Sequence, residues 1–218
     1  EGSILLADRS LIQSSGENIR ATALIDILLG GIDAGAGDVS VQTELGSVLD
    51  SGDTYTDVIA DGYRVTAGNS VGAIGLVGAN ALDTAVGTVS VLANGGGIGI
   101  TDADDITVGS VGLSLRRLSA DESVTDVVDD AQSDLVTASG GAIVLRSRAG
   151  TVIINDGDNT GTGVSANGDG NVLLEGVDVE INTGVASDTG DISVSADGDV
   201  TVGADATIST GGGSVSLD

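Results

Sequence analysis

Apolar residues recur along this chain in short alternating groups that are separated by turn residues. Near the end, Ile192 and Val194 alternate with serines, and the same pair returns 23 residues later as Val215 and Leu217. Between the two pairs lies a third alternating stretch, residues 200–202. Alternation with a period of two predicts β-strands, and glycine, aspartate and serine at the breaks predict turns. Short strands that return at a fixed period are typical of a stacked-repeat architecture.

A longer repeat runs through the first two thirds of the chain. Residues 37–41 (GDVSV) return as residues 87–91 (GTVSV) and, less closely, as residues 141–145 (GAIVL). Each interval is interpreted as two coils of about 25 residues. The strands of the intervening coils are expected at Tyr63–Thr66, Ile106–Val108 and Val152–Asn155.

The sequence therefore predicts an all-β fold, a parallel β-helix (β-solenoid) of roughly nine or ten coils of about 20–25 residues. Residues 1–218 are expected to form a single solenoid segment that belongs to a longer repetitive chain. The inward-facing ladders are expected to stack Val172 on Ile192 on Val215, and separately Val179 on Val202.

Two segments have an alternative interpretation as helices. Residues 19–31 are rich in helix-forming side chains, and residues 119–135 open with Ser119 and Glu122 at the spacing of a helix capping box. The alternating pattern on both sides favours strands in both segments.

Composition agrees with a narrow, aliphatic core. The chain has two tyrosines, no phenylalanine or tryptophan, and no proline, which would interrupt a ladder of backbone hydrogen bonds. Tyr55 and Tyr63 are expected on the outer face or over the edge of a coil. The two ends, near Ile4–Leu6 and Val215–Leu217, would expose unpaired strand edges. We expect them to pair with further repeats of the same chain or with end-to-end copies in a fibre.

The charge restricts the partners. Thirty-three acidic residues and seven arginines, with no lysine or histidine, give a net charge of −26, which repels nucleic acid and anionic membrane. Of the acids, 27 are aspartates, which favour turns. No apolar run approaches the roughly 18 residues of a membrane helix, so membrane insertion is not expected.

Catalysis is not expected, because the residues that most often serve as bases and nucleophiles (His, Cys and Lys) are absent. The alternative is a carbohydrate-active β-helix, which binds or cleaves polysaccharide with surface carboxylates. Its candidates are the adjacent pairs Asp104–Asp105 and Asp129–Asp130. Such a site needs two carboxylates roughly 5–10 Å apart on one groove.

Calcium is the ion that the aspartate-rich turns fit best, although no cofactor is required. Asp156, Asp158 and Thr160 resemble the first half of a calcium-binding loop, but the bidentate glutamate expected at its end is missing. A second oxygen-rich turn contains Asp102, Asp104 and Asp105. Each turn has a structural alternative, in which the carboxylate hydrogen-bonds the backbone of its own turn.

The stretch GDISVSADGDVTVGADATISTGGGSVSL, residues 190–217, resembles the β-helical repeat regions of filamentous-haemagglutinin-like and other giant repetitive bacterial surface proteins. Residues 37–41, 87–91 and 141–145 carry the same pattern. The resemblance implies export to the bacterial surface or beyond, and a structural or adhesive role. Host or cell-surface glycans are partners that such a role would imply.

Overall fold

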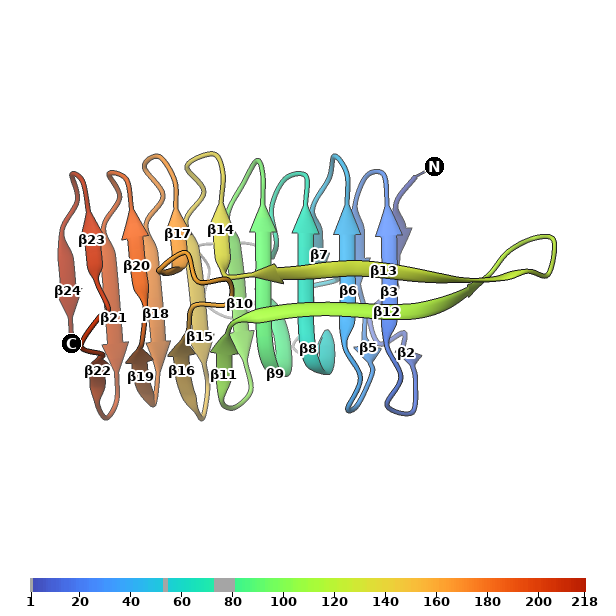
Figure 1. Ribbon diagram of the computed structural model, residues 1–218, viewed down its shortest axis with the longest axis horizontal. Coiled ribbons are helices and arrows are strands. Elements are labelled where there is room, and N and C mark those ends of the chain that lie inside the picture. The colour runs from blue at the N-terminus through green and yellow to red at the C-terminus, as the bar shows by residue number, and fades with distance from the viewer. Residues whose placement is uncertain (1, 53–54, 73–80) are drawn as a thin grey trace.

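The computed structural model describes residues 2–52, 55–72 and 81–218. Over these ranges the chain is all-β, and most strands run parallel in a sheet that closes almost completely on itself (Figure 1). This arrangement is compatible with the predicted β-solenoid. The same ranges contain no helix, and hence none long and apolar enough to cross a bilayer.

The parallel strands stack in three sets, which we call the first, second and third faces. The first face holds β1 (Ile4–Leu5), β4 (Ile27–Leu29), β7 (Val48–Asp50), β10 (Ile98–Asp102), β15 (Ile143–Ser147), β18 (Val172–Gly176), β21 (Ile192–Ala196) and β24 (Val215–Leu217). Val71 bridges β7 to β10.

The other two faces share two long strands that turn a corner, β8 (Val58–Ala67) and β9 (Leu82–Ala93). The second face also holds β2 (Ile12–Gln13), β5 (Ile32–Asp33), β11 (Ile106–Val108), β16 (Thr151–Ile154), β19 (Asp178–Ile181) and β22 (Val200–Val202). The third face also holds β3 (Ile19–Ala23), β6 (Val39–Thr43), β14 (Leu135–Thr137), β17 (Thr162–Ala166), β20 (Gly184–Ser187) and β23 (Ile208–Thr210).

The core consists of aliphatic side chains that stack directly above one another along each face. On the first face, Ile98, Ile143, Val172 and Ile192 are paired in succession and are almost completely buried. Val215 continues this ladder, so the predicted stack of Val172, Ile192 and Val215 is confirmed. Strands also occur at the three positions expected for the intervening coils.

Three expectations about side-chain positions are wrong. Val179 stacks on Val200, and Val202 stacks on Ile181, so the predicted register is displaced by two residues. Ile143 lies on the first face, whereas the repeats at residues 37–41 and 87–91 lie on the third. Tyr63 is fully buried between Val39 and Val89 in the core instead of lying on the outer face.

One element leaves the parallel stack. The strands β12 (Ser110–Leu118) and β13 (Val124–Ser133) form a long antiparallel hairpin, which lies across the stacked strands and runs past the N-terminal end of the rod (Figure 1). At its tip, the Ser119 amide donates to the carbonyl of Ser123, and Glu122 has a positive φ of 63°. The serine and glutamate that matched a capping box therefore close a hairpin turn.

Candidate functional site

Three carboxylates, one buried and two more exposed, lie together where the hairpin rejoins the rod. Asp134 follows β13, while Asp156 and Asp158 belong to the loop between β16 and β17. One oxygen from each carboxylate lies within 4.8 Å of the other two. Oxygens bound to one calcium ion at about 2.4 Å are at most about 4.8 Å apart, so these three carboxylates are close enough to share one ion.

The loop itself is folded by its aspartates. Asp156 accepts hydrogen bonds from the backbone amides of Asp158, Thr160 and Gly161, at 3.1, 3.2 and 2.7 Å. Asp158 accepts a second bond from the Thr160 amide at 3.0 Å. The structural alternative for these residues is thus realised, because the carboxylates satisfy the amides of their own turn. The calcium assignment for Asp156, Asp158 and Thr160 stays a prediction.

The three carboxylates differ in electrostatic environment. Asp134 is buried, and this burial, together with the charges of Asp158 and Asp156, raises its pKa although Gly157 and Ser133 donate hydrogen bonds to it. A hydrogen bond from the Thr160 side chain, supported by the Thr160 amide, lowers the pKa of Asp158. A divalent cation would relieve the repulsion that Asp134 experiences.

Asp134 was not among the residues expected to bind an ion. It lies next to the loop because the coils stack: the Gly157 amide, 23 residues later, donates to its carboxylate at 3.4 Å. A separation of one coil brings residues into contact across adjacent strands. A search for acidic residues one coil away from residues 156–158 would therefore have found Asp134.

The second predicted group is not assembled into a site. Asp102 is fully buried, and its carboxylate accepts hydrogen bonds from the Thr84 hydroxyl at 2.6 Å and the Val86 amide at 3.1 Å. Desolvation raises its pKa to about 6. Asp105 instead accepts the Thr151 amide at 2.7 Å, and Asp104 is exposed. Among the described residues, Asp102, Asp104 and Asp105 are not brought together as ligands.

Many turn aspartates and asparagines bond the next coil. Asn171 accepts the amide of Asp191 at 2.8 Å, and the Asp191 carboxylate accepts the amide of Ser214 at 2.7 Å. Asp178 accepts the amide of Asp199 in the same way, at 2.8 Å. These side chains extend the backbone ladder around the corners, where strand pairing stops. Much of the aspartate content therefore has a structural explanation.

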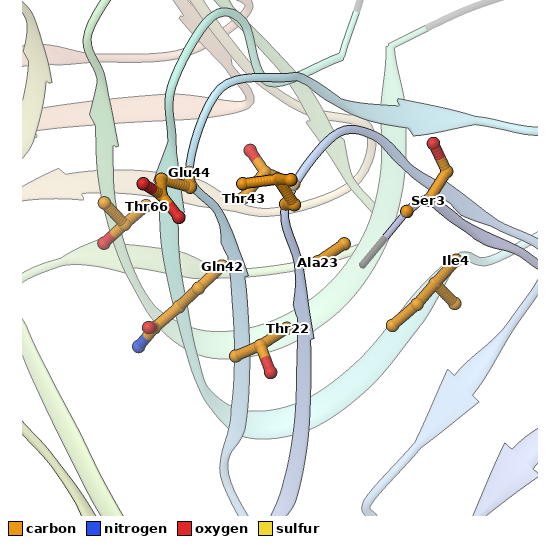
Figure 2. Close-up of a pocket in the computed structure, with 10 residues that line it drawn as sticks. Ser3, Ile4, Thr22, Ala23, Gln42, Thr43, Glu44 and Thr66 are labelled. Atoms are coloured by element: carbon orange, nitrogen blue, oxygen red, sulfur yellow. The ribbon is translucent and has the colours of Figure 1, made fainter.

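A surface pocket at one end of the rod offers little to a sugar. It lies at the N-terminal end of the rod and has a volume of about 660 Å³ (Figure 2). Threonines, Gln42 and small residues line it, with Glu44 as its only carboxylate and no aromatic ring among its lining residues.

The predicted carboxylate pair Asp129–Asp130 lies on the hairpin. Asp129 forms an ion pair with the guanidinium of Arg20 at 2.8 Å.

The aromatic side chains are not exposed as a sugar-binding pair. Tyr63 is in the core, and its hydroxyl has no hydrogen-bond partner among the described residues. Burial, with the nearby charge of Asp57, raises its pKa. Tyr55 is half exposed and has the guanidinium of Arg9 stacked over its ring at 4.5 Å.

The fold and these sites define the chain as an all-β protein built from stacked parallel strands. Comparison with protein-family models, curated proteins and solved structures finds no match.

Proposed function

We propose that this chain is the body of a rigid rod, a parallel β-solenoid of nine coils with a structural or adhesive role. The supporting observation is the first-face ladder, which continues from one end of the rod to the other. It passes through Ile4, Ile27, Val48, Val71, Ile98, Ile143, Val172, Ile192 and Val215. Eight steps of about 4.8 Å give a stacked length of roughly 40 Å.

The rod is stiff for a physical reason. Parallel strands of the inner coils have neighbours on both sides, and the aliphatic ladders of the described residues run continuously from coil to coil. The acidic surface keeps neighbouring rods apart in solution, because a net charge of −26 resists non-specific association. Placement on a bacterial surface or outside the cell, and contact with further repeats or with glycans, rest on the resemblance of the repeats.

The carbohydrate-active alternative has less support. A glycosidase needs two carboxylates on one groove, and sugar binding generally uses exposed aromatic faces. The pocket at the N-terminal end has one carboxylate, that of Glu44, among its described lining residues, and Tyr63 is buried. Calcium at Asp134, Asp156 and Asp158 would act within the proposed role by fixing the surface loop to the point where the hairpin rejoins the rod.

Small-angle X-ray scattering of the full chain tests the proposed rod. We expect an elongated particle whose longest dimension exceeds its cross-section, with a thin extension at one end from the hairpin. A glycan array and a polysaccharide-cleavage assay test the alternative. A compact, isotropic particle would contradict the rod, and turnover of a polysaccharide would replace the structural role with the catalytic one.

A further inference from the structure

The β12–β13 hairpin has one side against the rod and one side toward solvent. In an antiparallel pair, residues that face each other in register project on the same side of the ribbon. Leu113 and Asp129 face each other and are buried, and Asp129 pairs with Arg20 of the rod, so their side lies on the rod. Side chains alternate along a strand, so the next rung, Ser114 with Val128, projects away from the rod, and both residues are exposed.

The solvent side of the hairpin collects exposed aliphatic side chains around a charged centre. We call this side the outer patch. Its three rungs are Ser114 with Val128, Arg116 with Asp126, and Leu118 with Val124. Leu118, Val128 and Val124 are 68%, 62% and 48% exposed. Three large aliphatic side chains within three rungs of one ribbon differ from the single apolar residues scattered over an ordinary surface, and such a concentration marks an interaction site.

The central rung of the outer patch carries two charges that the chain itself does not use. Arg116 and Asp126 face each other across the ribbon. In the part of the chain that the structure describes, the ion pairs are made by Arg20, Arg146 and Arg148, and neither Arg116 nor Asp126 takes part in one. A partner that fits this rung has a carboxylate over the guanidinium and a guanidinium over the carboxylate. The same rung, turned about the long axis of the ribbon, has this arrangement.

We propose that the outer patch is a dimerisation surface that binds the outer patch of a second copy of this chain. The two-fold axis runs along the ribbon, so β12 of one copy lies over β13 of the other. Arg116 then meets Asp126 of the second copy, Leu118 meets Val124, and Val128 meets Ser114. Both copies use the same surface, so the contact closes with two copies. The inference concerns the hairpin and goes beyond the proposed rod.

The charges select this arrangement over the other two-fold arrangement. An axis across the strands would lay each strand over its own copy, which places Arg116 over Arg116 and Asp126 over Asp126. Like charges in contact oppose that arrangement. With the axis along the ribbon, Asp130, the next acidic residue on the solvent side, lies over residues 110–115 of the second copy, which carry no charge.

The net charge of −26 on each copy opposes any association, but the hairpins act as spacers. Figure 1 shows the hairpin lying across the stacked strands. Stacked sheets lie about 10 Å apart, so two hairpins between two rods keep the rods about 30 Å apart. This separation is several times the Debye length of about 8 Å at physiological salt, which screens most of the repulsion. Six residues per copy are few beside the roughly 20–30 of a stable interface, so we expect a weak, reversible dimer.

Charge reversal tests the central rung. Arg116→Asp places acidic residues opposite each other, and Asp126→Arg does the same with basic residues. In sedimentation velocity at physiological ionic strength, each variant alone should associate at least tenfold more weakly than the natural chain. An equimolar mixture should restore the dimer, because the new carboxylate of one chain meets the new guanidinium of the other.

The double variant controls for the fold of the hairpin. Arg116→Asp combined with Asp126→Arg in one chain keeps opposite charges facing each other within the ribbon and between the copies. It should therefore dimerise as the natural chain does. Protection of the β12 and β13 amides from hydrogen exchange, measured on dilute monomer, verifies that the hairpin is folded in every variant.

A second pair of variants tests the apolar rungs. Val128→Asp places a carboxylate within the contact and should weaken the dimer at least tenfold. Val177→Asp is the matched control. It makes the same change of side chain and charge at an exposed valine between β18 and β19, outside the hairpin, and should leave the dimer unchanged.

Each outcome supports or overturns the outer patch. A natural chain that stays monomeric up to millimolar concentration overturns it. A dimer that survives both single charge reversals, or that weakens equally in Val128→Asp and Val177→Asp, places the contact elsewhere and also overturns it. None of these results affects the proposed rod, because scattering from the dilute monomer tests the rod separately.

Discussion

Arg20 and Asp129 are 109 residues apart in the sequence and form an ion pair that fixes the hairpin to the first coil. The Nε atom of Arg20 lies 3.0 and 2.8 Å from the two carboxylate oxygens. Burial alone would raise the pKa of Asp129, but hydrogen bonds from Arg20, Ser40 and Gln42 and the charge of Arg20 hold it below its usual range. The pair lies in a partly buried position, where its removal has a cost.

Substitution of Arg20 by alanine should loosen the hairpin. The Asp129 carboxylate would lose its charged donor, at a cost of about 2 kcal/mol to hairpin docking. Hydrogen exchange of the β12 and β13 amides should accelerate. Arg146→Ala is the matched control, because it breaks an ion pair of the same length, to Glu175, away from the hairpin. Equal acceleration in both variants would contradict a specific role of the Arg20–Asp129 pair.

The same pair predicts a pH dependence. The folded-state pKa of Asp129 is depressed, so its stabilising contribution is present above the unfolded pKa, near 3.8, and is lost as the pH falls through the folded value. Hairpin protection in the natural chain should therefore decrease in strong acid. In Asp129→Asn, protection of the hairpin amides should already be weak at neutral pH and should change less as the pH falls.

Asp102 should produce the opposite dependence. Its pKa is raised from 3.8 to about 6, so the stability associated with its protonated form is present below pH 3.8 and is lost as the pH rises through 6. The full difference is roughly 3 kcal/mol. Denaturant unfolding measures this. Between pH 4 and pH 7, the free energy of unfolding of the natural chain should fall by about this amount more than that of Asp102→Asn. A pH-independent difference between the two proteins would contradict the burial argument.

At the corners, the hydrogen-bond acceptor should matter and the charge should not. Asp191→Ala removes the acceptor of the Ser214 amide and should lower the free energy of unfolding by about 1 kcal/mol. Asp191→Asn keeps an acceptor in place, as Asn171 does one coil earlier, and should be nearly neutral. Denaturant titration distinguishes them, and an equal loss in both variants would show that charge is required.

Calcium should stabilise the fold beyond the effect of salt. Ligand binding to the folded state alone raises the melting temperature by mass action. Thermal unfolding in millimolar calcium is compared with unfolding in sodium chloride of matched ionic strength. Asp158→Asn should abolish the difference, and Asp104→Asn, an exposed aspartate outside the cluster, should retain it. Coincident melts of the natural chain would reject the ion site.

The parallel all-β arrangement could be predicted because alternating apolar residues recur at a regular separation along the sequence. Ile192 and Val215 are stacked in the register that their 23-residue separation predicts. The face of each repeat was harder to assign. Residues 141–145 have the same glycine and aliphatic pattern as residues 87–91 but lie on another face, because a pattern of alternating aliphatics fits every face equally.

The hairpin could not be predicted from the period. The chain leaves the stack after Gly109 and returns at Asp134, whose amide donates to the Gly109 carbonyl at 3.2 Å. An excursion of this kind adds residues without changing the ladder, so the period gives no sign of it. The contact between Asp134 and the loop at residues 156–158 follows the one-coil separation of 23 residues. Tyr63 was misplaced because composition alone does not show that a rung between two valines accommodates a ring.

The hairpin also makes the two halves of the rod unequal. In a stack of coils, each coil contacts only its neighbours, so such molecules normally fray from either end. Here the β12–β13 hairpin begins after β11 and contacts β9, β8 and β6 before it reaches Arg20 in β3. These contacts join the N-terminal coils into one cooperative unit. Over residues 135–218, all of which the structure describes, no second hairpin crosses the coils. Under heat or mechanical force, the C-terminal coils should therefore unfold first, one at a time. The N-terminal coils that the hairpin crosses should stay folded.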